Sequence, residues 1–535
     1  MFPRNFIERT LILLMLWTWS GALWGAGVAR DVAELLAGDE DPIHLAGEVL
    51  WSTPFLRSLY ASPEQAPRWE ASQLVTLRAA IAGAADDGLV PADYLLDQLA
   101  EGQDLAPAVR ELLATEALAR LAFTLHFGKS NPHTLDSDFN YSRSLATTNP
   151  VAWLRTAISS DDLAEILADL RPQGWYYSAL TDALADYRAQ AARGGWPVLS
   201  AGDTLEPGMD DQRVGELRAR LRASGDVSGS APPMAADHYD AALLAAVEAF
   251  QRRHGLAVDG LVGPATREAL NVPLATRIEQ LRINLERIRW VFRDLADEFV
   301  AVNIAAYQAS YFADREMQWH ARAIVGRPYR QTPVFKDQLT YIELNPTWTV
   351  PPTILRHDIL PKLRRDPGYL HEQGFRVIDP NSGPVDPANI DWPNMTAGRF
   401  PYLLRQDPGP KNALGRIKFM FPNAHAVYLH DTPARTLFSQ PERDFSSGCI
   451  RIEQPLMLAT LLLRDNERWS RAALQTAIDS GLTRRIDLPR KVPILLVYLT
   501  AFADQNGTIH FRRDIYGRDP AIAAALDGPL RWASQ

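Results

Sequence analysis

One cysteine and one histidine stand close enough in the sequence to form a nucleophile and its base. Cys449 is the single cysteine among 535 residues and lies in "SSGCIR", and 18 residues separate it from His430 in "HAVYLHDTP". An imidazole with an ordinary pKa of about 6.5 can take the proton of a thiol with a pKa of about 8.5, which gives a reactive thiolate. The alternative, which residue type alone favours, is a small buried thiol and an ordinary core histidine.

The residues beside this pair could complete a reactive site. Gly448 has no side chain, so its backbone can approach a substrate closely, and the N–H groups around Cys449 could hold an oxyanion. Alternation along a predicted strand places Tyr428 and His430 on one face. Because a chain of 18 residues can return to its starting point, the sequence predicts that these side chains meet.

The order "HDTP" followed by "SSGCIR", with this gap, resembles the active-site signature of L,D-transpeptidases of the YkuD-domain type. The resemblance implies that Cys449 is the nucleophile, that His430 is the base, and that the backbone of Gly448 and Cys449 binds the oxyanion. Many relatives carry a histidine two places before the cysteine, where this chain has Ser447. His430 is therefore the only histidine of the motif.

Four further residues are expected to contact substrate. Arg451 matches the arginine of the signature and could either support the loop or pair with a substrate carboxylate. Tyr428 and Ser447 flank the reactive pair. The segment "NPTWTVPP" also resembles the family, and its Trp348 is the expected wall of a groove under an inserted lid.

The resemblance implies a cysteine-dependent acyl transfer that needs no cofactor or metal. Its substrates would be peptidoglycan stem peptides on glycan strands, with a tetrapeptide stem as donor and a 3-3 cross-link as product. Three alternatives stay open: an L,D-carboxypeptidase or endopeptidase that uses water, and a non-catalytic scaffold that binds peptidoglycan. The 11 histidines show no H-x-H or H-E-x-x-H spacing, which disfavours a metallohydrolase.

Composition and the N-terminus bound the location and the partners. The net charge is -9 without a clustered basic stripe, so nucleic acid is not an expected partner. Arg4 and Arg9 precede an apolar run from Leu11, followed by small residues. This layout predicts a signal peptide within residues 1–29, or an anchor in the inner membrane, and hence a periplasmic protein. Other proteins of cell-wall synthesis are further candidate partners.

The fold class expected from the chain is multidomain α+β, with the reactive pair in its last part. The patterns resemble the large periplasmic YcbB-like branch of the family, which implies an enzyme built from separate modules. Residues 206–272 resemble the peptidoglycan-binding domain type 1, and a third short helix should start near Pro264. The expected parts are a helical scaffold domain at 30–205, this three-helix module, a linking helix at 273–297 and a β-rich catalytic domain at 298–535.

The catalytic domain is expected to contain an insertion at residues 353–412. Period-two strand patterns on both sides lapse there into helix and loop broken by Pro and Gly. A long insertion in a compact β domain commonly serves as a lid or binding loop, while a rigid packing subdomain is the alternative. After the insertion, Asn506-Gly507 predicts a hairpin with a tight two-residue turn.

Overall fold

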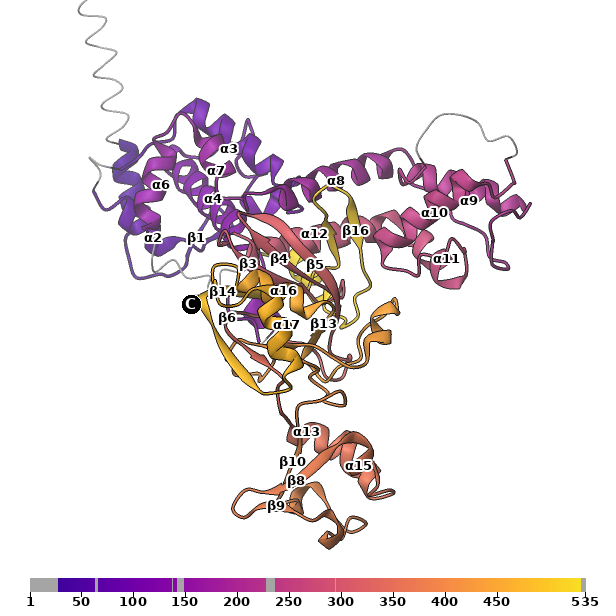
Figure 1. The fold of residues 1–535 in the computed structure, drawn as a ribbon. Coiled ribbons are helices and arrows are strands. Elements are labelled where there is room, and N and C mark those ends of the chain that lie inside the picture. Colours follow the sequence, from indigo (N-terminus) through magenta and orange to yellow (C-terminus); the bar gives the residue numbers. More distant parts are fainter. Residues whose placement is uncertain are drawn as a thin grey trace, which may run out of the picture.

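The structure is a computed structural model that describes residues 27–62, 66–136, 138–141, 149–227, 236–293 and 295–530. Most of the segment predicted as a signal peptide or anchor lies outside these residues. Within them, the model contains no helix of the length and apolar character that crossing a bilayer requires. Figure 1 shows the predicted arrangement of a helical region, a small helical module and a β-rich part, so the α+β fold class is confirmed.

The N-terminal region is organised around one long buried helix, α4. Pro107 fits its first turn, where no N–H is needed, and Gly128 ends it with a φ of 85°. Shorter helices pack on α4. Helix α8 leaves this region and runs beside α12, the long helix described below (Figure 1). The elements are β1 (Ile43–Leu45), β2 (Glu48–Leu50), α2 (Thr53–Leu59), α3 (Ala71–Gly83), η1 (Pro91–Tyr94), α4 (Pro107–Phe127), α5 (Pro132–Leu135), α6 (Pro150–Ile158), α7 (Leu163–Ala168) and α8 (Trp175–Ala192).

The small module consists of three helices, and its third helix begins at Pro264 as predicted. His254 at the end of the second helix stacks on Phe511 of the catalytic domain, with 5.7 Å between ring centroids. Arg512 donates to the backbone carbonyl of Arg253 over 2.8 Å. The module is thus docked on the β-rich part. Its helices are α9 (Gln212–Ala223), α10 (Ala241–His254) and α11 (Pro264–Leu270).

The predicted linking helix is α12 (Leu274–Val291), and it is buried far beyond one apolar stripe. Glu286 and Arg289 are both fully buried and form an ion pair at 2.8 Å. The backbone N–H of Ser130 donates to Glu286 over 2.7 Å. A buried charge needs such partners, and here they come from the scaffold as well as from the helix itself. The predicted linking helix is therefore a central helix of the protein, because its polar side is covered as well as its apolar side.

The catalytic domain is built on a closed barrel of eight strands in the order β11-β12-β13-β5-β4-β3-β14-β6. Alternate residues such as Phe419, Leu429 and Ile450 are fully buried in its core. The strands are β3 (Phe299–Asn303), β4 (Gln308–Ala313), β5 (Glu316–Ile324), β6 (Lys336–Leu344), β11 (Ile417–Met420), β12 (Leu429–His430), β13 (Ile450–Ile452) and β14 (Arg484–Val497).

Helices and a hairpin cover this barrel. The hairpin contains Asn506-Gly507, but its strands first pair at Ala503 and Ile509, so the connection has five residues and the predicted two-residue turn is wrong. Asp504 accepts from the N–H groups of Asn506 and Thr508, which stabilises the longer loop. These elements are η5 (Arg435–Ser439), α16 (Pro455–Leu462), α17 (Arg471–Asp479), β15 (Ala501–Ala503), β16 (Ile509–Phe511) and α18 (Asp519–Asp527).

The insertion is a folded subdomain with its own sheet and core. Its sheet has the order β7-β10-β8-β9, so the expectation of helix and loop without strands is wrong. Leu363, Val377 and Trp392 are buried in a cluster separate from the barrel core. Figure 1 shows the subdomain projecting away from the barrel. Its elements are β7 (Trp348–Thr349), α13 (Pro352–Ile354), η2 (Leu355–Ile359), α14 (Leu360–Leu363), α15 (Tyr369–Gln373), β8 (Phe375–Asp379), β9 (Gly383–Val385), η3 (Pro387–Asn389), η4 (Ala397–Arg399) and β10 (Leu403–Gln406).

Candidate active site

Two short neighbouring strands place the predicted nucleophile and base on one face of the barrel wall. β12 and β13 are parallel, and His430 pairs with Arg451 in their register. The backbone N–H of Ile450 donates to the carbonyl of Tyr428 over 3.1 Å, which fixes this register. Since side chains alternate along strands, Tyr428, His430, Cys449 and Arg451 share one face, and the intervening apolar residues point into the barrel. Strand pairing therefore sets Cys449 and His430 on the same face, and their roles as nucleophile and base stay predictions.

The Cys449 thiol is half-buried beside Tyr428. Burial raises the pKa of this thiol, because a thiolate is poorly solvated there. Hydrogen bonds from the backbone N–H and hydroxyl of Tyr428, and the positive charges of Lys418 and Arg451, oppose that rise. Burial outweighs these opposing effects, so the resting group is a neutral thiol.

His430 is buried, and its tautomer follows from one contact. Its Nδ1 lies 2.6 Å from the carbonyl oxygen of Asp431. Because a carbonyl only accepts, Nδ1 carries the proton and the Nε2 lone pair is the basic position. Burial, and next the charge of Arg451, lower the His430 pKa to about 3. The imidazole is therefore neutral at rest.

The backbone around Gly448 is held firmly. Its φ of 113° lies in a region that side-chain-bearing residues rarely adopt. The Gly448 N–H donates to the hydroxyl of Ser446 over 3.1 Å, and its carbonyl accepts from Thr332 over 2.9 Å. Gly448 could therefore donate to an oxyanion only after Ser446 releases its N–H.

Ser447 is exposed and links the cysteine loop to the inserted subdomain. Arg330 donates to the Ser447 hydroxyl over 2.9 Å and forms an ion pair with Asp358 of η2. Sequence reasoning missed Arg330 and Asp358, which lie 117 and 89 positions from Ser447. No local motif signals such a contact.

Trp348 lies where the barrel meets the insertion. It is the first residue of β7, which belongs to the inserted sheet, and its ring is 6.1 Å from that of Phe375. Its side chain also lies close enough to the Tyr428 hydroxyl to oppose the rise in pKa that burial causes there. Burial, and next the Cys449 charge, raise the Tyr428 pKa. Trp348 thus joins the insertion to the residue beside the thiol.

Two basic residues flank the reactive pair. Lys418 of β11 pairs in register with His430, and its ammonium lies 4.2 Å from the centroid of the Tyr428 ring. Among the described residues, no hydrogen-bond partner reaches the buried Nε of Arg451. Arg451 was predicted from its motif. Lys418 was missed, because a lysine on a strand is usually exposed to solvent.

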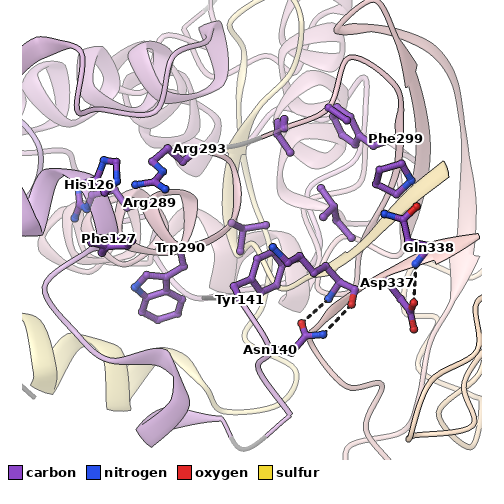
Figure 2. Close-up of a pocket in the computed structure, with 16 residues that line it drawn as sticks. His126, Phe127, Asn140, Tyr141, Arg289, Trp290, Arg293, Phe299, Asp337 and Gln338 are labelled. Carbon is purple, nitrogen blue, oxygen red and sulfur yellow. Dashed lines mark hydrogen bonds between the residues drawn. The ribbon is translucent and has the colours of Figure 1, made fainter. Parts of the chain in front are cut away.

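A separate cavity of about 400 Å³ lies between the scaffold and the barrel. Figure 2 shows its lining by His126 and Phe127 of α4, Arg289 and Trp290 of α12, and Tyr141. None of the predicted site residues lines it. In the part of the chain that the structure describes, no group of three or more acidic, histidine or cysteine side chains is arranged to hold a metal ion.

Comparison with known families divides the chain as the fold does. Residues 54–184 match "Scaffold domain", residues 210–270 match "Putative peptidoglycan binding domain", and residues 297–472 match "L,D-transpeptidase catalytic domain".

Individual relatives support these matches. A Haemophilus influenzae protein described as "Putative L,D-transpeptidase" is 38% identical over 247 residues, which cover 46% of this chain and 49% of that protein. The Bacillus licheniformis "N-acetylmuramoyl-L-alanine amidase CwlL" is 42% identical over 72 residues, 13% of this chain and 19% of that one. The chain thus spans about half the length of the first relative and a fifth of the second.

Among solved structures, an L,D-transpeptidase from Xylanimonas cellulosilytica aligns at 16% identity over 56% of this chain and 98% of that chain, with a TM-score of 0.18. A superposition this loose adds nothing to the assignment. The sequence matches and the barrel carry it: residues 297–472 belong to the L,D-transpeptidase catalytic domain family, a cysteine-dependent enzyme family, and the chain joins this domain to a scaffold domain and a peptidoglycan-binding domain.

Proposed function

We propose that this protein forms 3-3 cross-links in peptidoglycan through a Cys449 thioester. The observation that carries the proposal is the parallel pairing of β12 with β13, which sets His430 and Cys449 on one face of a transpeptidase-family barrel. The donor is a tetrapeptide stem and the acceptor is the side-chain amine of a second stem's diaminopimelate. The peptidoglycan-binding domain supports peptidoglycan as the substrate and a site outside the cytoplasm, in the periplasm.

The first half of the reaction is acylation. The Cys449 sulfur attacks the carbonyl carbon of the third stem residue, diaminopimelate, while its proton passes to Nε2 of His430. The backbone N–H of Cys449 stabilises the oxyanion, joined by that of Gly448 once the Ser446 hydroxyl has released it. When the tetrahedral intermediate collapses, the bond to the terminal D-alanine breaks and its nitrogen takes the proton from His430. The products are a thioester and free D-alanine.

The second half transfers the acyl group. The acceptor amine attacks the thioester carbonyl, gives a proton to His430 and displaces the Cys449 thiolate, which is then reprotonated. One peptide bond is broken and one is made, so no outside oxidant or energy source is needed. Water in place of the amine would make the protein an L,D-carboxypeptidase. The inserted subdomain lies beside Ser447 and Trp348, and by limiting the access of water to the thioester it would favour the amine as acceptor.

Muropeptide analysis tests the products directly. After incubation of the purified protein with tetrapeptide-rich sacculi, we expect dimers joined through two diaminopimelate residues, with release of D-alanine. An appearance of tripeptide monomers alone would assign the protein as a carboxypeptidase. Loss of existing 3-3 dimers from sacculi that contain them would assign it as an endopeptidase.

The contact of Arg330 with Asp358 and Ser447 predicts how the insertion affects this outcome. Arg330→Gln removes a charge-assisted hydrogen bond and an ion pair, so the inserted subdomain should separate from the cysteine loop more often. We expect backbone amide exchange in residues 353–412 to accelerate about fivefold, and the ratio of cross-linked to hydrolysed product to fall.

Arg376→Gln is the matched control, because Arg376 pairs with Asp407 within the same subdomain, where both side chains are about half exposed. This control should leave the product ratio unchanged. Faster exchange in Arg330→Gln with an unaltered product ratio would show that the insertion does not exclude water from the thioester.

A further inference from the structure

Lys418 occupies a position that places positive charge over the reactive face. It is on β11, directly across from His430, and Glu343 of β6 is its register partner on the other side. Residues paired across strands point to the same face of a sheet. The Lys418 side chain therefore rises on the same face as Tyr428, His430 and Cys449.

The ammonium is held in place without being neutralised. It lies 4.2 Å from the centroid of the Tyr428 ring, a cation–π contact. No other residue within the described ranges forms a hydrogen bond or an ion pair with it. Lys418 is half-buried, and burial lowers its pKa, while the charges of Glu343 and Cys449 act in the opposite direction. Its charge is thus available to a developing anion.

The reactive pair needs such a charge. His430 is neutral at rest and is buried, so it offers the thiol no positive charge before the proton moves. A thiolate that forms in a partly dehydrated site is unstable unless cations lie near it. The charges of Lys418 and Arg451 both act to lower the Cys449 pKa against the effect of burial. Arg451 extends from β13, which begins directly after the cysteine, and Lys418 approaches from across Tyr428.

We propose that Lys418 is an electrostatic positioning residue, whose ammonium, fixed on the Tyr428 ring, stabilises the Cys449 thiolate. The proposal rests on the role of Cys449 as nucleophile and adds a residue that no signature motif contains. Lys418 keeps its proton throughout, and the proton from sulfur still passes to Nε2 of His430.

Other titratable or charged groups near the thiol also affect its pKa. On this face and in the adjoining loop they are Tyr428 just before β12, His430 of β12, Arg451 of β13, Glu343 of β6, and Arg327 and Arg330 after β5. Only a comparison between variants that change Lys418 alone isolates its part.

The test is the pH dependence of alkylation of the full chain by iodoacetamide, a small neutral reagent that has no carboxylate for Lys418 to bind. In Lys418→Met, which keeps an aliphatic stem over Tyr428, the pH midpoint should rise and the rate at pH 7 should fall at least about fivefold. Lys418→Gln should behave alike, and Lys418→Arg should restore most of the rate because it retains the charge.

The control is Lys336→Gln, since Lys336 also lies over a tyrosine, 5.1 Å from the ring centroid of Tyr141, but lines the separate cavity. It should leave the profile unchanged. Thermal unfolding verifies that each variant is folded. An unshifted midpoint in folded Lys418→Met or Lys418→Gln overturns the proposal. Alkylation needs no peptidoglycan, so a shifted midpoint in a protein that makes no cross-links would retain this role and reject the proposed function instead.

Discussion

Replacement of Cys449 by alanine should abolish both 3-3 cross-linking and the covalent adduct with a carbapenem. Cys449 is the only thiol of the chain, so no second sulfur can form the thioester or open the β-lactam ring. Intact-protein mass spectrometry should show a mass increase of one carbapenem in the wild type and none in Cys449→Ala. The loss expected is complete within detection.

The same measurement separates the enzyme from a non-catalytic scaffold. Cys449→Ser keeps the size of the side chain but replaces the sulfur with a poorly activated hydroxyl, and it should also lack measurable turnover. Both variants should unfold near the wild-type temperature, because the thiol is only half-buried and no disulfide depends on it. If the wild type itself acquires no adduct while folded, the scaffold interpretation gains support. Cross-linking by Cys449→Ala would reject the mechanism.

The sequence could predict the reactive pair because strand alternation and a short motif both act locally. Tyr428 immediately precedes β12, which ends at His430, and Cys449 immediately precedes β13. Lys418 and Arg330 could not be found this way, since their roles depend on which strands and loops become neighbours in the closed barrel. A lysine on a strand or an arginine in a loop gives no local sign that it lies beside the cysteine loop rather than in solvent.

The same limit explains the errors in the fold. Helix α12 showed an apolar stripe, but the buried pairing of Glu286 with Arg289 depends on the scaffold that covers it. The insertion contains many Pro and Gly residues, which are typical of loops, so its short strands were not predicted. Asn506-Gly507 marked a hairpin correctly, while hydrogen bonds to Asp504 selected a longer connection than the dipeptide suggests.

Removal of the base should be the second largest effect. His430→Ala should lower the rate of carbapenem acylation by about two to four orders of magnitude, the usual range for a positioned general base. A base whose pKa is about 3 accepts a proton poorly in the resting site, so transfer must accompany attack by the sulfur. Stopped-flow fluorescence or timed mass spectrometry would give the rate.

The pH profile of the wild type provides an independent check. An ordinary histidine would be half protonated, and lost as a base, at a pH of about 6.5. Because the His430 pKa is lowered to about 3, its neutral form persists as the pH falls, and protonation of His430 should reduce acylation only below about pH 4.

His425→Ala is the matched control for His430→Ala: this exposed histidine is five residues earlier, 3.7 Å from Asp138, and its loss should leave acylation unaltered. An acylation rate of His430→Ala within a few-fold of wild type would assign the proton transfer to another group. Since a raised pKa keeps Tyr428 protonated, its phenolate would be a scarce base, and solvent would be the next group to test.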